Sequence, residues 1–344
     1  MAGRLFEAGI IGLGMALAPH ARALSELGER VRVRAVWSPI ADERGRASRE
    51  WGFPAVEEVA AIFEDPSIDF VLLLTPPGAR RAYVEAAAAA GKHLLMEKPM
   101  ARDLAEARAL VDICEHTGVT LGIVLQQRFR EAAGRLRELV RAGDAGALAA
   151  AQLWLPWWRP QSYFDEGGRG TVARDGSGVL ASQAIHALDL LGWIAGPVAE
   201  VTAVAGTTRL HRMETEDFVA AGLRFENGAL GGVLATVAEY PGFPEQIHFL
   251  FERVTAILEG ATLRLHWQDG REQRFGEPVP TGSGERPMDF PHHWHRALLA
   301  DFLDALEAGR EPAIPGREAL SVHALIDALL ASAREGGRVP VARP

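Results

Sequence analysis

The stretch Gly91-Lys92-His93-Leu94-Leu95-Met96-Glu97-Lys98-Pro99 joins a short apolar segment to an abrupt polar end. Its apolar half, residues 93–96, predicts a buried strand. In open α/β sheets the last residues of such a strand reach the sheet edge where ligands bind. Lysine is rare here, because only Lys92 and Lys98 are lysines among 36 basic residues. An ammonium can be tuned to share a proton and a guanidinium cannot, so Lys98 is a candidate for chemistry as well as a solvated charge.

Composition limits the class of protein. The chain has 344 residues, 48% of them apolar, and a net charge of −9, which argues against nucleic-acid or anionic-membrane surfaces as partners. Cys114 is the single cysteine, so we expect no internal disulfide and interpret it as a buried small hydrophobe. The first seven residues lack the apolar region of a signal peptide, and no run approaches membrane-spanning length. We therefore predict a soluble, cytoplasmic protein.

The N-terminal segment has the order strand, glycine turn, helix. An apolar run from Ala8 to Leu13 meets Gly12-Leu13-Gly14, and an alanine-rich helical segment follows. In this context the glycines let the backbone approach a pyrophosphate, and the helix N-terminus supplies N–H donors. The third glycine of the fingerprint is replaced by Leu17. We predict a dinucleotide site whose phosphate-binding residues are Gly12, Gly14, Met15 and Ala16.

The next strand, Val31–Trp37, predicts how the adenosine end of the cofactor is held. An acidic residue usually follows this strand when the cofactor has a free ribose diol. Ser38 takes that position, and Arg44 follows a few residues later. A small hydroxyl and an arginine suit a 2′-phosphate, which favours NADP slightly. Asp42 or Glu43 could still bind a diol, so NAD(P) is the cofactor and the choice stays open.

The order of elements predicts two domains. Strands at 70–74, 93–96 and 119–124 alternate with helices, which is typical of a Rossmann domain with a doubly wound parallel sheet over residues 1–125. From 126 to 344 we expect an α+β domain, because strands follow one another without helices between and so predict an antiparallel sheet with flanking helices. Its expected strands are 149–155, 198–206, 218–225, 229–237, 246–250, 254–258, 262–267 and 271–275.

A glycine-rich entry at Asp175-Gly176-Ser177-Gly178 leads into a helix that carries Ser182, His186 and Asp189. Their spacing of four and three residues places them on roughly one helical face. A lone histidine on a helix is more often structural than catalytic. Imidazole titrates near neutrality and can accept a proton from an alcohol, which makes His186 a candidate base.

Together these motifs resemble the Gfo/Idh/MocA family, the relatives of glucose–fructose oxidoreductase and inositol dehydrogenase. The resemblance spans nearly the whole chain and rests on Gly12-Leu13-Gly14 with His20, on Thr75-Pro76-Pro77, on Glu97-Lys98-Pro99 and on the segment 175–189. It implies a Rossmann domain followed by an open antiparallel sheet, with substrate held between them. It also implies that Lys98 and His186 form the catalytic pair, with Glu97 beside the nicotinamide ribose.

The chain departs from the family pattern at two positions. Ser182 stands where many members have an aspartate, and Arg80 stands where many have a histidine after Thr-Pro. Ser182 is therefore one candidate in the proton relay, and the alternative is that Asp189 or a water helps His186 instead. Further candidates for cofactor binding are Thr75, Pro76 and Gln126.

Substrate contacts are expected from an aromatic, arginine-rich segment. Residues 157–171, which include Trp158, Arg159 and Arg169, are similar to a branch with nucleotide-sugar dehydrogenases, although such a loop can also serve for packing alone. Arg128 and a histidine near 293–295 are further candidates. Three histidines at 292, 293 and 295 have no carboxylate or cysteine partner nearby in sequence, so we predict no metal.

The function expected from these features is hydride transfer between NAD(P) and a secondary alcohol of a sugar, cyclitol or sugar derivative. Two alternatives stay open, which are a non-catalytic dinucleotide-binding sensor and a nicotinamide-dependent glycosidase. The resemblance further implies a homodimer or homotetramer, because the outer face of the second sheet would otherwise be uncovered.

Overall fold

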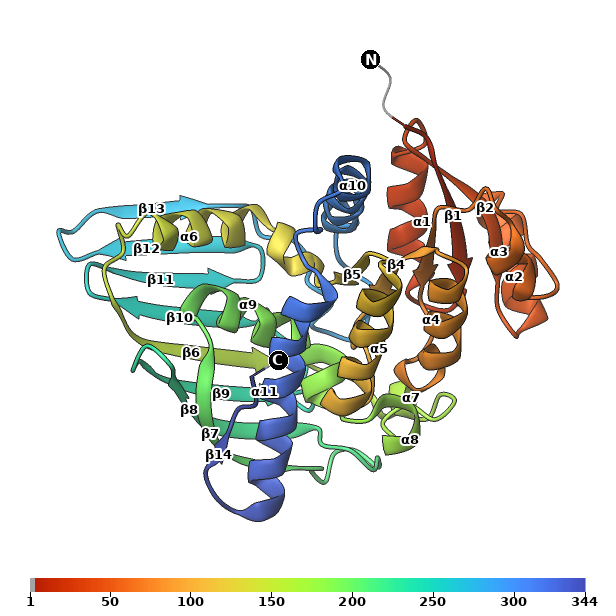
Figure 1. The fold of residues 1–344 in the computed structure, drawn as a ribbon. Helices are drawn as coiled ribbons and strands as arrows, with labels where there is room; N and C mark the ends of the chain where they lie inside the picture. Colours follow the sequence, from red (N-terminus) through yellow and green to blue (C-terminus); the bar gives the residue numbers. More distant parts are fainter. Residues whose placement is uncertain (1–3, 344) are drawn as a thin grey trace. The chain divides into compact units, whose positions relative to one another are not determined.

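The computed structural model describes residues 4–343 and divides the chain into two compact units (Figure 1). Unit 1 comprises residues 4–101, 105–126 and 292–319, and unit 2 comprises residues 102–104, 127–291 and 320–343. The sequence-based boundary near 125 falls at the end of the second stretch of unit 1, residues 105–126. The expectation that residues 126–344 form one domain is wrong, because residues 292–319 return to unit 1.

Unit 1 is built on a five-stranded parallel sheet of order β2-β1-β3-β4-β5. Its strands are β1 (Phe6–Ile11), β2 (Val31–Trp37), β3 (Phe70–Leu73), β4 (His93–Glu97) and β5 (Leu121–Val124). Apolar residues fill both faces of β3, as a parallel sheet covered by helices requires. The predicted doubly wound sheet is confirmed, and its strand order reverses between β1 and β3.

The helices of unit 1 alternate with these strands. They are α1 (Leu17–Glu26), α2 (Ala41–Trp51), α3 (Ala60–Glu64), α4 (Arg80–Ala89) and α5 (Leu104–Thr117), with the short turns η1 (Pro77–Ala79) and η2 (Gln126–Phe129). The late helix α10 (His293–Ala308) packs beside α1 and against β5 (Figure 1). Phe302 on α10 meets Phe70 edge to face at 5.4 Å, and this apolar contact explains why the segment joins unit 1.

Unit 2 is built on a nine-stranded sheet of order β13-β12-β11-β10-β6-β9-β8-β7-β14. The strands are β6 (Leu148–Pro156), β7 (Val198–Gly206), β8 (Phe218–Phe225), β9 (Leu230–Thr236), β10 (Gln246–Phe251), β11 (Val254–Glu259), β12 (Thr262–Trp267), β13 (Glu272–Phe275) and β14 (Val339–Pro340). All predicted strands are present. The sheet is mixed and not wholly antiparallel, because β6 and β9 pair in parallel.

Unit 2 also contains helices, of which α6 and α9 pack on this sheet. The helices are α6 (Glu131–Arg141), α7 (Gln161–Phe164), α8 (Val172–Asp175), the π-helical segment η3 (Leu180–Ala184), α9 (Ile185–Ala195) and α11 (Gly316–Glu335), whose first residues belong to unit 1. The stretch Val172–Ala195 is long and apolar enough to cross a membrane, which corrects the sequence-based statement that no such run exists. In this fold 83% of its apolar window is buried, as in the core helix of a globular unit.

Candidate active site

The glycine turn lies where the strand order of unit 1 reverses. Gly12 follows β1 with φ of +96°, and a Cβ there would stand 2.8 Å from backbone atoms of Leu74 and Thr75. Only glycine fits this close approach between the ends of β1 and β3. Gly14 is open, with Glu43 Oε1 as its nearest neighbour at 3.9 Å from a built Cβ. The turn therefore has the backbone access that a pyrophosphate at the start of α1 requires.

Two buried polar atoms at the same edge of the sheet suit a dinucleotide. Thr75 Oγ1 follows β3 and Gln126 Oε1 follows β5, and neither has a hydrogen-bond partner within residues 4–343. Buried polar atoms are normally hydrogen-bonded, so these atoms fit a bound polar group. Met15 and Pro76 are exposed beside them. The donors, acceptors and glycines present at this edge match the requirements of NAD(P).

The end of β2 differs from what the sequence led us to expect. Arg44 Nη1 donates to the carbonyl of Ser38 at 2.7 Å, and its Nη2 meets Glu57 Oε2 at 2.8 Å. Ser38 Oγ donates to the carboxylate of Glu43, which also faces Gly14. The charged group nearest the glycine turn at this strand end is therefore the carboxylate of Glu43, and Arg44 is bonded to Ser38 and Glu57.

Arg80 cross-links the ends of β3 and β4. Its guanidinium is fully buried and donates to the carbonyl of Thr75 at 2.7 and 3.0 Å, and to the carbonyls of Glu97 and Pro99. Burial lowers the pKa of Arg80 to about 10, which leaves it a cation at neutral pH. The arginine that departs from the family pattern thus fixes the backbone on both sides of Lys98, a role that sequence reasoning missed.

Glu97 is held as an anion by a hydrogen bond to the buried His20. Its Oε1 lies 2.9 Å from Nε2 of His20, and its Oε2 accepts the backbone N–H of Lys98 at 3.0 Å. Burial by itself would raise the pKa of Glu97, but the hydrogen bond to His20 and the nearby charge of Lys98 lower it to about 2. The carboxylate is therefore a permanent acceptor at the end of β4.

His295 completes this cluster from α10. Its ring meets that of His20 edge to face at 4.8 Å, and burial lowers the pKa of His295 to about 3, so its imidazole is neutral. One ligand atom from each of His20, Glu97 and His295 lies within 4.8 Å of the others. A tetrahedral ion with bonds of about 2.1 Å would draw them to about 3.4 Å apart. The trio is a possible ligand set that sequence spacing could not show, and the absence of a metal stays a prediction.

The two lysines have different environments. Lys92 is buried and its Nζ donates to the carbonyl of Asp65 at 2.6 Å. Lys98 is half-buried at the carboxyl end of β4, and Lys98-Pro99 is a cis peptide bond. The position of Lys98 next to the anionic Glu97 is the one that the sequence led us to expect for a group that contacts substrate.

Unit 2 carries the second set of candidates. His186 is buried in the first turn of α9, and Ser182 is half-buried in the π-helical η3 just before it. π-helical turns occur frequently at functional sites. The predicted single helix through 180–191 is therefore interrupted, because five residues of η3 follow the wider spacing before α9 begins at Ile185.

Two arginines expected to contact substrate have structural partners instead. Arg128 forms a buried two-pronged ion pair with Asp189, with Nε–Oδ2 at 2.8 Å and Nη2–Oδ1 at 2.6 Å. Arg159 is 2% exposed and donates to carbonyls of Trp158, Gly282 and Gly284. Asp189 holds the guanidinium of Arg128, and backbone carbonyls hold the two terminal nitrogens of Arg159, so these observations argue against the substrate contacts predicted for them.

Trp158 and Arg169 are both partly exposed in unit 2. The Trp158 ring packs against His211 at 5.9 Å and Tyr240 at 5.5 Å. Arg169 is half-buried, lies 4.4 Å from the centre of the Tyr163 ring and pairs with Glu166 at 3.0 Å. Aromatic faces next to a cation form a surface that suits a sugar with an anionic substituent.

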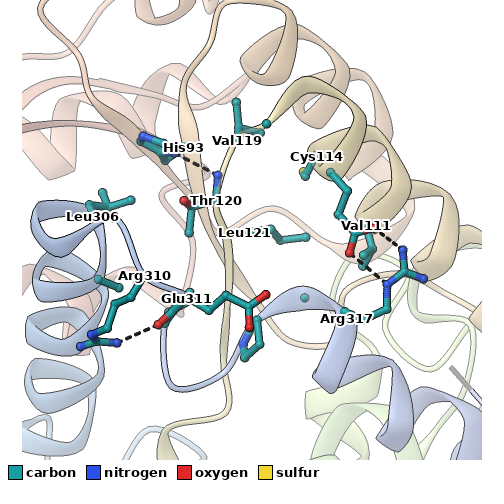
Figure 2. Close-up of a pocket in the computed structure, with 17 residues that line it drawn as sticks. His93, Val111, Cys114, Val119, Thr120, Leu121, Leu306, Arg310, Glu311 and Arg317 are labelled. Atoms are coloured by element: carbon teal, nitrogen blue, oxygen red, sulfur yellow. Dashed lines mark hydrogen bonds and ion pairs between the residues drawn. The ribbon is translucent and has the colours of Figure 1, made fainter.

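A separate pocket of about 480 Å³ opens at the opposite, amino edge of the unit 1 sheet (Figure 2). His93 and Leu121 line it from the first residues of β4 and β5. Arg310 and Arg317 line it too, and each pairs with acids, Arg317 with Asp112 at 2.8 Å. Cys114 also lines it, and burial raises the pKa of its thiol to about 12. The charges of the pocket are balanced, and it is remote from the glycine turn.

A parallel sheet with a glycine turn at its switch point, and a strand ending in Glu97-Lys98-Pro99, defines a nicotinamide-dependent oxidoreductase. Comparison of the chain with known protein families leads to the same class. Residues 6–124 match the oxidoreductase family with an NAD-binding Rossmann fold, and residues 134–257 match the GFO/IDH/MocA C-terminal domain. The chain belongs to the Gfo/Idh/MocA family of oxidoreductases.

Several characterised proteins are similar to this chain along most of their length. D-apiose dehydrogenase of Paraburkholderia graminis is 27% identical over 350 residues, which cover 97% of this chain and 89% of that protein. Scyllo-inositol 2-dehydrogenase (NAD(+)) of Bacillus subtilis is 26% identical over 66% of each chain. The WlbA dehydrogenase of Bordetella pertussis, solved in complex with NADH and UDP-GlcNAcA, has a TM-score of 0.85 and 28% identity over 98% of this chain and 99% of that one.

Proposed function

We propose that this protein is an NAD(P)-dependent dehydrogenase or reductase acting on a secondary alcohol of a sugar, cyclitol or sugar derivative. The observation that carries the proposal is the end of β4, where Lys98 stands beside the ionised Glu97 and the backbone on both sides is braced by Arg80. The relatives named above act on sugars or cyclitols, or bind a nucleotide sugar, which supports the substrate class.

Each candidate has a distinct role in the proposed reaction. His186 accepts the hydroxyl proton of the alcohol, and Ser182 orients that proton transfer from one turn earlier. Lys98 donates a hydrogen bond to the same oxygen and stabilises the negative charge that develops on it. Glu97 accepts a hydrogen bond from the nicotinamide ribose. The nicotinamide, when bound, supplies the hydride acceptor or donor.

The experiment follows reduced-nicotinamide absorbance with NAD or NADP and a panel of aldoses, cyclitols, sugar acids and nucleotide sugars. We expect one substrate class to give a signal that Lys98→Ala lowers by about 100-fold or more in kcat. Lys92→Ala is the matched control, because it removes the other lysine, whose Nζ binds a backbone carbonyl. Cofactor binding without turnover on any substrate would contradict the proposal and favour the sensor. Turnover of a glycoside without net cofactor reduction would favour the glycosidase.

For the cofactor we propose a preference for NAD, in place of the slight lean to NADP drawn from the sequence. The carboxylate of Glu43 faces Gly14 and is bonded to Ser38, whereas Arg44 is bonded to the Ser38 carbonyl and Glu57. A carboxylate accepts hydrogen bonds from a ribose diol and repels a 2′-phosphate. We expect Glu43→Gln to raise kcat/KM for NADP relative to NAD by about tenfold, and an unchanged ratio would contradict the assignment.

We also propose that the protein is a homodimer or homotetramer that buries one face of the unit 2 sheet. Three exposed apolar side chains share that face, which are those of Trp154, Leu234 and Val204. Their strands are neighbours, because Trp154 pairs with Leu234, Leu234 pairs with Ala220, and Ala220 pairs with Val204. An apolar patch on a sheet face marks an interface with another protein surface. Light scattering on Leu234→Glu should show a smaller species than the native protein, and equal masses would contradict the interface. A cytoplasmic location is proposed with it, to be checked by cell fractionation.

A further inference from the structure

The segment just before β8 holds the start of the helical stretch that carries His186. The carboxylate of Glu216 is buried and accepts three hydrogen bonds. Its Oε1 accepts from Ser177 Oγ at 2.8 Å and from the N–H of Leu180 at 3.1 Å, and its Oε2 accepts from the N–H of Gly178 at 2.9 Å. All three donors lie within four consecutive residues at the entry to η3.

The backbone of Glu216 engages the same four residues. Its carbonyl accepts the N–H of Val179 at 2.8 Å. A Cβ at Gly178 would stand 1.8 Å from that carbonyl oxygen, so the two segments are in direct contact and only glycine fits. The first N–H groups of a helix lack intrahelical partners, and Val179, at the cap position of η3, supplies no side-chain bond. Glu216 satisfies them from another part of the chain and places a negative charge where the helix dipole favours one.

Glu216 is itself held on a rigid support. The next residue, Asp217, is fully buried, and its carboxylate accepts from Thr208 Oγ1 at 2.7 Å and contacts His211 Nδ1 at 2.8 Å. The carbonyl of Asp217 accepts from Thr236 Oγ1 at 2.9 Å, which ties it to the end of β9. The carboxylate that caps the helix therefore has a fixed position relative to the sheet of unit 2.

A fixed cap matters here because η3 is π-helical. A π-helical turn holds one residue more than an α-helical turn, so relaxation to α geometry would rotate everything beyond it by about 100°. Ser182 lies inside this turn and His186 lies just after it. The bonds at residues 177–180 fix where the turn begins, and thereby decide which way the imidazole points.

We propose that Glu216 is a positioning residue for His186 and Ser182, and acts by fixing the start and register of the π-helical turn that presents them. The proposal rests on the proposed function, in which His186 accepts the substrate proton. Glu216 itself does not contact the reacting atoms. Its contribution to the reaction is orientation, which can be worth a factor of about 100 in rate when a catalytic group is displaced by about 1 Å.

The test compares Glu216→Gln with Glu214→Gln in the full-length protein. Glutamine keeps the shape of Glu216, removes the charge and turns an amide donor toward N–H donors. Glu214 lies on the same segment and accepts the N–H of Val172 at 3.0 Å, at the start of α8, which carries none of the proposed catalytic groups. We expect Glu216→Gln to lower kcat 10- to 100-fold with cofactor affinity within twofold of native, and Glu214→Gln to leave both within twofold.

Hydrogen exchange provides a readout that does not depend on turnover. We expect amides of residues 180–188 to exchange at least tenfold faster in Glu216→Gln and at the native rate in Glu214→Gln. Native kcat together with native exchange in Glu216→Gln would overturn the proposal, and so would faster exchange with native kcat. If the native enzyme turns over no alcohol, the proposed function fails, while the exchange comparison still decides whether Glu216 fixes the helical register.

A milder variant covers the case in which Glu216→Gln does not fold. Ser177→Ala removes one of the three hydrogen bonds to the carboxylate and leaves both backbone donors. We expect kcat to fall about two- to fivefold, with a matching increase in exchange over residues 180–188. A native kcat in Ser177→Ala, with Glu216→Gln unfolded, would assign Glu216 to stability alone and overturn the positioning role.

Discussion

Replacing Arg128 by methionine tests whether this residue belongs to the fold or to the substrate site. In the structure Nε and Nη2 of its guanidinium donate to the Asp189 carboxylate at 2.8 and 2.6 Å. The side chains of Arg128 and Asp189 are 7% and 4% exposed. The charged end of Arg128 also lies 5.3 Å from the centre of the Trp193 ring. Methionine preserves the length and apolar character of the stem and removes the charge, so Asp189 is left as a buried anion.

The size of the effect follows from this geometry. Two unit charges about 2.7 Å apart attract by about 6 kcal/mol at an effective dielectric constant of about 20, and the desolvation of both groups offsets part of this attraction. Removing one partner of a buried ion pair costs about 3–5 kcal/mol. Removing both charges in Arg128→Met/Asp189→Leu takes away that penalty, so we expect the double variant to lie within about 2 kcal/mol of the native protein.

Thermal unfolding without cofactor measures this prediction. For a unit of this size, 1 kcal/mol corresponds to about 2–4 °C in Tm, so Arg128→Met should lower Tm by roughly 6–20 °C. The double variant should recover most of that loss. A Tm within about 2 °C of native for Arg128→Met, together with a KM raised tenfold, would refute the structural role. That result would restore the substrate contact predicted from the sequence.

Three further predictions concern residues at other positions. Burial lowers the pKa of His295 to about 3, below the value of about 6.5 in the unfolded chain. The free energy of unfolding therefore has its full value above about pH 6.5 and falls by about 1.4 kcal/mol per pH unit as the pH drops toward 3. His295→Gln should flatten this slope in urea titrations between pH 7 and about pH 5, and an unchanged slope would contradict the assignment. Burial opposes the charged form of His211, but hydrogen bonds to Asp217 and to the Arg159 carbonyl raise its pKa. The charged imidazole therefore stabilises the fold below about pH 6.5, and this stabilisation is lost as the pH rises through the raised pKa. The deficit of His211→Leu should therefore shrink at alkaline pH, and a deficit independent of pH would count against a charged imidazole. Gly12→Ala should lower the free energy of unfolding by about 2 kcal/mol or more, because the new Cβ would lie 2.8 Å from backbone atoms of Leu74 and Thr75. It should also abolish cofactor binding measured by calorimetry, and a native affinity would refute the close approach.

Much of the fold could be read from local patterns. The strands of the first sheet, the glycine turn at Gly12 and the end of β4 at Glu97-Lys98 follow from apolar runs and from residues that stop them. Such signals are local, because the side chains that decide a strand or a turn lie within a few positions of it. The successive strands of unit 2 were predictable for the same reason, whereas the parallel pairing of β6 with β9 was not.

The charge state and partners of the candidate groups were decided by contacts between distant segments. His20 and Glu97 are 77 positions apart, Arg128 and Asp189 are 61 apart, and Glu216 and Ser177 are 39 apart. Spacing along one chain does not encode such pairs, since they depend on how strands cross and which helices cover them.

The sequence by itself determined the class of fold, the dinucleotide edge and the identities of Lys98 and His186 as candidates, because each rests on short-range pattern. Only the tertiary structure decided that Glu97 is a buried anion, that Arg128 bonds Asp189 and Arg159 bonds backbone carbonyls, and that Glu216 caps the helix of His186. The physical reason is that burial and hydrogen-bond partners set a polar group's charge and freedom, and both arise only when remote segments pack together.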